Sequence, residues 1–184
     1  MLFRSPVLTN PNHHLNSRVD KVWPQANDTL SMPAGIITFS NDDLCCPEPN
    51  HNRPLFVSVE HRNKLVRRAL VDQGSFINIL PLKILKELGY DMENLVPNSM
   101  SVTSISHVKT DTLGCLSLHI SVGPFSMPHA FHVMEVDPMW HMLLGRPWIH
   151  DHRCVPSSWH QCIKAAPFKT GQIRIRGLRN PFAI

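Results

Sequence analysis

The segment Leu70-Val71-Asp72-Gln73-Gly74-Ser75 decides the fold of this 184-residue chain. The apolar run that ends at Val71 predicts a short buried strand, and Asp72 follows it directly. Burying an unpaired carboxylate is costly, so a chain that places an aspartate at a strand end usually uses it. Gly74 suits a tight turn beneath that carboxylate. Two interpretations stay open at this point: a catalytic aspartate, or an aspartate that only caps a turn.

Short stretches of β character surround this segment, and they predict a mainly β protein. The clearest is residues 116–122, where Leu116, Leu118 and Ile120 alternate with polar residues. Other strands are expected at residues 36–39, 55–59, 64–71, 102–105, 125–136, 142–145, 159–165 and 172–176. One short helix is expected from Pro81 to Leu88, with Pro81 in its first turn and Gly89 after its end.

Composition divides the chain into three parts. Residues 1–50 are rich in proline and asparagine and are expected to form a poorly ordered tail or linker. Residues 51–168 carry the strands of one domain, and residues 169–184 form a C-terminal extension. No signal peptide and no apolar run of about 18 residues is present, which predicts an intracellular protein, cytoplasmic or nuclear, without a membrane span. The five cysteines are expected to be free thiols.

Charge and histidine content favour neither nucleic acid nor metal as a partner. The net charge is +4, but no run of five or six basic residues exists, so nucleic-acid binding is only a weak alternative. Among 12 histidines, the pairs His129/His132 and His150/His152 lack the second short-spaced Cys/His doublet of a zinc site. Neither a metal nor another cofactor is expected. The segment Ser157 to His160 lacks the context of a nucleophilic serine.

Three elements in a fixed order carry a resemblance to a known family. The first is Asp72-Gln73-Gly74-Ser75 after its apolar strand, and the second is the helix at residues 81–88. The third is Leu143-Leu144-Gly145-Arg146-Pro147-Trp148-Ile149-His150, followed by Val155-Pro156-Ser157-Ser158-Trp159-His160-Gln161. Together they resemble the retropepsin-like aspartic protease region of plant gypsy-type retrotransposon polyproteins, over roughly residues 36–178.

The resemblance implies a closed β barrel that is half of a twofold dimeric enzyme. Peptide hydrolysis needs a base that activates water and an acid that polarises the carbonyl. Two carboxylates about 3 Å apart divide these roles because they share one proton. This chain has a single Asp-x-Gly-Ser, so the implied enzyme is a homodimer in which Asp72 faces Asp72 of a second copy. Its implied substrate is an extended peptide of its own polyprotein.

The resemblance also implies roles for particular residues. Asp72 is the catalytic residue, and Ser75 is expected to hydrogen-bond its carboxylate. The implied active-site loop is Gln73, Gly74 and Ser75; the supporting strand is Leu144, Gly145 and Arg146; the flap over the substrate is Ile105, Ser106, His107 and Val108.

Three positions depart from the family pattern. Gln73 replaces the threonine or serine whose hydroxyl bonds across the dimer axis, and His107 stands where relatives often carry a flap-tip glycine. Phe76 replaces a carboxylate that pairs with the arginine after the last glycine, so Arg146 is expected to bind Asp151 or a backbone carbonyl. These departures leave an alternative function, a catalytically inactive relic of the fold or a module for dimerisation or peptide binding.

Overall fold

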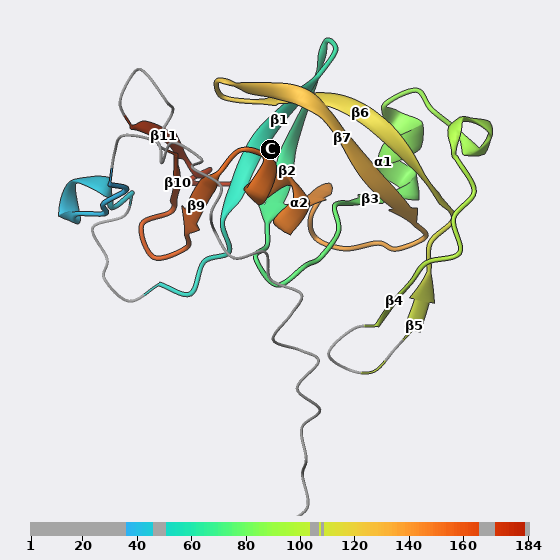
Figure 1. Ribbon diagram of the computed structural model, residues 1–184, viewed down its shortest axis with the longest axis horizontal. Helices are drawn as coiled ribbons and strands as arrows, with labels where there is room; N and C mark the ends of the chain where they lie inside the picture. Colours follow the sequence, from blue (N-terminus) through green and yellow to red (C-terminus); the bar gives the residue numbers. More distant parts are fainter. Residues whose placement is uncertain (1–35, 46–50, 104–106, 108, 166–171, 183–184) are drawn as a thin grey trace, which may run out of the picture. The chain divides into compact units, whose positions relative to one another are not determined.

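A computed structural model describes residues 36–45, 51–103, 107, 109–165 and 172–182 (Figure 1). The strands are β1 (Phe56–His61), β2 (Lys64–Val71), β3 (Ile79–Pro81), β4 (Ser101–Thr103), β5 (Lys109–Asp111), β6 (Gly114–Val122), β7 (Phe125–Met134), β8 (Met142–Leu144), β9 (Cys154–Ser157), β10 (Cys162–Ala165) and β11 (Ile173–Arg176). The helices are α1 (Leu82–Glu87), α2 (Arg146–Asp151) and the 3-10 turns η2 (Asn41–Asp43) and η3 (Met92–Asn94).

Six strands close into a barrel in the order β1-β2-β8-β3-β7-β6, which confirms the expected mainly β barrel. The long hairpin of β6 and β7 pairs in register from Gly114 opposite Val133 to Val122 opposite Phe125. The short strand β8 lies between β2, to which it is parallel, and β3, to which it is antiparallel. The alternating side chains of β6 are buried at Leu116, Leu118 and Ile120, as the sequence pattern predicted.

The expectation of one helix was wrong, because a second helix, α2, follows Gly145. Six residues are too few to show a helical period, so the segment carried no amphipathic signal. Its sequence does carry a local one, since Pro147 lies in the first turn, where a missing N–H costs nothing. Trp148 on α2 is fully buried in the barrel core. Strand β9 was also missed, and residues 36–39 form no strand.

A separate three-stranded sheet, in the order β11-β10-β9, carries the segment 36–45 against it. Asp43, at the end of η2, is buried and binds two cations: its Oδ2 lies 2.6 Å from Lys164 Nζ and its Oδ1 lies 3.0 Å from Arg174 Nη1. The hydrogen bond from Lys164 holds the pKa of Asp43 well below its usual range. Lys164 also donates to the carbonyl of Thr38 at 2.7 Å. This part of the expected tail is therefore anchored to the C-terminal sheet.

The other hairpin, β4 with β5, lies outside the barrel pairing. Its strands pair antiparallel from Ser101 opposite Asp111 to Thr103 opposite Lys109. His107 has a φ of 60°, in the left-handed region. Glycine tolerates that region without strain, whereas the Cβ atom of His107 does not favour it.

Four cysteines, Cys45, Cys115, Cys154 and Cys162, are free thiols in the structure. Burial raises the pKa of the Cys154 thiol to about 12, so this thiol is unreactive. None of the helices in the described ranges is long and apolar enough to cross a membrane.

Two histidines join α2 to β7 through a hydrogen bond that requires at least one of them to be neutral. His129 Nε2 lies 3.0 Å from His152 Nε2, while His129 Nδ1 lies 3.2 Å from Asp151 Oδ2. The ring of Phe125 stacks on His152, with 4.5 Å between the ring centroids. Burial, and then the charge of His129, lowers the pKa of His152 to about 4, and burial lowers the pKa of His129.

We expect this pair to make the fold sensitive to acid. In the unfolded chain both histidines take up protons below about pH 6.5, whereas the folded pKa values are lower. Their contribution is therefore complete above pH 6.5 and is lost as the pH falls toward 4. In His152→Gln, the decrease in the urea unfolding midpoint between about pH 7 and pH 4.5 should shrink, since one of the four histidines whose pKa burial lowers is gone.

The matched control is His150→Gln, because His150 lies on the same helix and is exposed. It should keep the wild-type pH dependence. An unchanged pH dependence in His152→Gln would show that the histidine pair does not control acid stability.

Candidate active site

The loop that carries Asp72 leaves β2 and re-enters the barrel at β3, so it passes around the end of β8. Asp72 N donates to Leu144 O at 3.0 Å, which continues the pairing of β2 with β8 by one residue. Arg146 N donates to Ser75 O at 2.9 Å on the other side of the loop. The strand end at Leu144 therefore fixes both sides of the loop, and Asp72 sits half-buried where they meet.

Gly145 lies in contact with the backbone of this loop. A Cβ atom at residue 145 would lie 2.2 Å from Ile77 O and 2.9 Å from Ser75 O, so only glycine fits. The supporting strand, expected to run from Leu144 to Arg146, ends two residues earlier, at Leu144. Gly145 is the N-cap of α2, and Arg146 is the first residue of that helix.

The buried side chain of Asn78 hydrogen-bonds to two other segments next to the Asp72 loop. The sequence analysis missed this residue. Its side chain is 2% exposed; Oδ1 accepts from Gly145 N at 2.9 Å, and Nδ2 donates to Ala130 O at 3.1 Å. One amide thereby joins the Asp72 loop, the start of α2 and strand β7. An asparagine inside the apolar run Phe76 to Leu80 was the available signal, because a buried amide needs partners.

The carboxylate of Asp72 is oriented by its own loop. Oδ1 accepts from Gly74 N at 2.8 Å, which leaves Oδ2 without a partner among the described residues. The expected hydrogen bond from Ser75 to this carboxylate was wrong. Ser75 Oγ donates instead to Ile77 O at 2.8 Å, because the loop turns its side chain toward β3.

Arg146 was expected to bind Asp151 or a backbone carbonyl, and it does not bind Asp151. The Asp151 carboxylate faces His129, and the exposed guanidinium of Arg146 makes no ion pair within the described ranges.

Gln73 is exposed and hydrogen-bonded within its own chain. Its Nε2 donates to Pro156 O in β9 at 3.2 Å. A proline is tolerated in β9 because this is an edge strand. The residue that departs from the family pattern therefore connects the active-site loop to the C-terminal sheet.

A cleft of about 650 Å³ opens beside Asp72, within the size range of ligand sites. It is lined by the active-site loop with Leu55 and Val71, and by the turn after β9. Trp159 on that turn is 47% exposed, and His51 stacks on it, with 5.7 Å between the ring centroids. The indole therefore adds an apolar surface to a cleft that the carboxylate of Asp72 also lines.

Ser157 and His160 meet at the same wall, with Ser157 Oγ 2.8 Å from His160 Nδ1. The backbone N–H of His160 also donates to Ser157 Oγ, at 3.3 Å, so the pair forms a local turn. No carboxylate contacts His160 among the described residues, and Phe39 stacks on its ring. This arrangement lacks the third member that would orient the histidine as a base.

The expected flap follows β4 and precedes β5 in the chain. His107 is exposed, while Ile105, Ser106 and Val108 lie outside the described residues. The position of the flap over the cleft stays a prediction.

No three His, Cys, Asp or Glu side chains in the described ranges gather in a way that could hold a metal ion. His129 and His132 point to opposite faces of β7, as the sequence analysis inferred from their spacing: His129 pairs with His152 and His132 contacts Asn98.

Comparison with solved structures identifies the fold. The retroviral protease-like domain of Ddi1 from Leishmania major is 19% identical, with a TM-score of 0.54, and the match covers 71% of this chain and 98% of that domain. A retropepsin-like aspartic protease from Rickettsia conorii gives 17% identity over 55% of this chain and 81% of that one, at a TM-score of 0.44. No protein-family profile and no curated protein matches the chain. The protein has a retropepsin-like fold, as its sequence motifs predicted.

We expect Asn78→Ala to destabilise the protein by about 1–3 kcal/mol, because it leaves the buried Gly145 N–H without an acceptor. Urea unfolding followed by Trp fluorescence measures the loss. Gln172→Ala, which truncates an exposed amide, should change stability by less than about 0.5 kcal/mol. Equal stability of the two variants would contradict the role given to Asn78.

We expect Gln73→Ala and Gln73→Glu to loosen the active-site loop equally, since neither side chain can donate to Pro156 O. A lost hydrogen bond of about 0.5–1 kcal/mol corresponds to roughly 2- to 5-fold faster amide exchange at Gly74 and Ser75, measured by mass spectrometry. If glutamate protects the loop as well as glutamine does, the Gln73–Pro156 bond does not hold it.

Proposed function

We propose that the protein is an aspartic-type endopeptidase. The observation that carries the proposal is the placement of Asp72: a loop fixed by β8 and Asn78 holds its carboxylate where it lines an open cleft. A carboxylate that is oriented by one backbone N–H and retains an unpartnered oxygen is suited to bind and activate a water molecule.

The proposed enzyme is a homodimer. The base that activates water and the acid that polarises the peptide carbonyl are two carboxylates, and this chain has one Asp-x-Gly-Ser. Asp72 of a second copy supplies the other. One Asp72 takes a proton from the water as it attacks and later passes that proton to the leaving amine, while the protonated Asp72 donates a hydrogen bond to the developing oxyanion.

We further propose that the substrate is an extended segment of a retrotransposon polyprotein of the plant gypsy type. The ordered motif set from Asp72 to Gln161 supports this origin. The cleft supports an extended chain, because strand edges and apolar walls bind peptides as an added strand. The flap candidates Ile105, Ser106, His107 and Val108 would cover that chain.

A second candidate function is a non-catalytic module with this fold that dimerises or binds peptides. The observation that favours it is the bond from Gln73 to Pro156 of the same chain. In the family pattern, the residue at this position bonds across the dimer axis, and that bond holds the two active-site loops rigid.

The test is hydrolysis of a peptide library near pH 5, followed by mass spectrometry, with wild-type protein and two variants. Asp72→Asn should lower the rate at least about 100-fold, because it removes the acid–base group. Asp137→Asn is the matched control, since Asp137 is exposed and lies outside the cleft. Sedimentation of the same samples measures dimerisation.

Equal hydrolysis by wild type and Asp72→Asn would overturn the proposal. A dimer that cleaves no library peptide between about pH 4 and pH 7 would support the non-catalytic module instead.

A further inference from the structure

Residues 36–45, here called the strap, precede the barrel in the chain and are fixed on the C-terminal sheet (Figure 1). Asp43, in the second half of the strap, is 4% exposed and binds both Lys164 and Arg174. In the first half, Phe39 presents its ring to Lys164, whose Nζ lies 5.2 Å from the ring centroid. The strap is therefore bound to the sheet at two separate points.

The strap also contacts the turn after β9, and Phe39 makes this contact. Its ring stacks on the ring of His160, with 4.9 Å between the centroids and 28° between the planes. His160 in turn lies close to Ser157, which lines the Asp72 cleft: the distance from Nδ1 to Oγ is 2.8 Å. Trp159, which directly precedes His160, lines the cleft as well. Phe39 therefore packs behind the part of the cleft wall that carries the indole.

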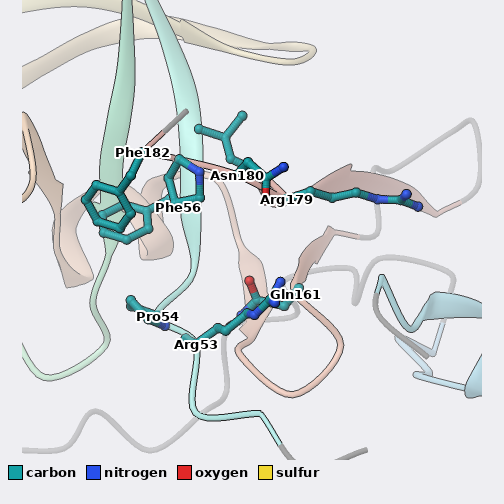
Figure 2. Close-up of a pocket in the computed structure, with 9 residues that line it drawn as sticks. Arg53, Pro54, Phe56, Gln161, Arg179, Asn180 and Phe182 are labelled. Atoms are coloured by element: carbon teal, nitrogen blue, oxygen red, sulfur yellow. The ribbon is translucent and has the colours of Figure 1, made fainter. Parts of the chain in front are cut away.

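The other supports of this turn also precede β1 in the chain. His51 stacks on Trp159, and its Nε2 lies 3.0 Å from Trp159 O. Gln161 Nε2 donates to Arg53 O at 3.0 Å and to Ser158 O at 2.8 Å. Figure 2 shows the Gln161 side chain against Arg53. Segments that precede β1 thus contact the turn at three successive residues, 159–161.

The Asp72 carboxylate has supports of its own. Asp72 N donates to Leu144 O, and Asp72 Oδ1 accepts from Gly74 N. Neither hydrogen bond involves the strap or the turn after β9. A change at Phe39 should therefore affect the Trp159 wall and leave the carboxylate in place.

We propose that Phe39 is a positioning residue that acts through His160: it fixes the Trp159 wall of the Asp72 cleft before a ligand binds. A side chain that is already ordered costs less entropy on binding, so a fixed indole increases affinity. The identity of that ligand, a peptide, rests on the proposed function, whereas the fixing of the wall does not.

The first test measures amide exchange by NMR in the full-length protein without ligand. Phe39→Ala should speed exchange at His160 and Gln161 about 3- to 10-fold, the range expected for loss of one aromatic pair, while β6 and β7 keep their wild-type rates. Phe39→Tyr retains the ring and should keep the wild-type rates. Ile36→Ala is the matched control, because Ile36 lies in the same strap and is 87% exposed. It should also exchange like wild type.

Equal exchange at His160 and Gln161 in Phe39→Ala and in wild type would overturn the proposal. An equally large increase in β6 and β7 would overturn it too, because the strap would then stabilise the whole fold and not the wall in particular.

The second test uses the peptide that the wild-type protein cleaves fastest. Phe39→Ala should raise KM about 3- to 10-fold and change kcat less than about 2-fold, because it weakens binding without displacing Asp72. Phe39→Tyr should restore KM. A lower kcat at unchanged KM would contradict the role of Phe39 in binding. A protein that cleaves no peptide would overturn the proposed function alone, since the exchange test requires no hydrolysis.

Discussion

The close contact between Gly145 and the loop that follows Asp72 is the constraint on which the rest of the site depends. No side chain fits between residue 145 and the Ile77 carbonyl, so β8 can end directly beneath the loop. The hydrogen bonds at Asp72 N, Gly145 N and Arg146 N all follow from that approach. The position of the Asp72 carboxylate is therefore set by backbone geometry, and the side chains at the cleft are left to vary.

The features of this site differ in how readily the sequence predicts them. Asp72-Gln73-Gly74-Ser75 and Leu143-Leu144-Gly145-Arg146 are local motifs, and they led to the closed barrel and to Leu144 and Gly145 as the support of the Asp72 loop. Asn78 and the Gln73–Pro156 bond depend on partners 67 and 83 positions away, which no local pattern encodes. Helix α2 was missed because six residues show no period, and Ser75 was assigned the wrong partner because a serine two residues from a carbonyl has competing acceptors.

Acid has opposite effects on the proposed chemistry and on the fold. In the proposed dimer, two aspartates that share a proton work best where one of them is protonated. The histidine pair that holds α2 against β7 needs the opposite condition, since burial lowers the pKa of His152 to about 4. Protonation of Asp43 also destabilises the fold, because its ion pairs with Lys164 and Arg174 are then lost. The fold thereby sets a lower pH limit on any chemistry at Asp72.

The long sequence separation of these contacts has a consequence for the order of folding. Lys164 meets Asp43 across 121 positions, and Gln161 meets Arg53 across 108. Such contacts form late, since the chain must lose loop entropy before they stabilise it. During synthesis, a nascent chain that has not yet emerged past Gly145 has no β8 on which to organise the Asp72 loop. The carboxylate acquires its geometry only when most of the domain has left the ribosome.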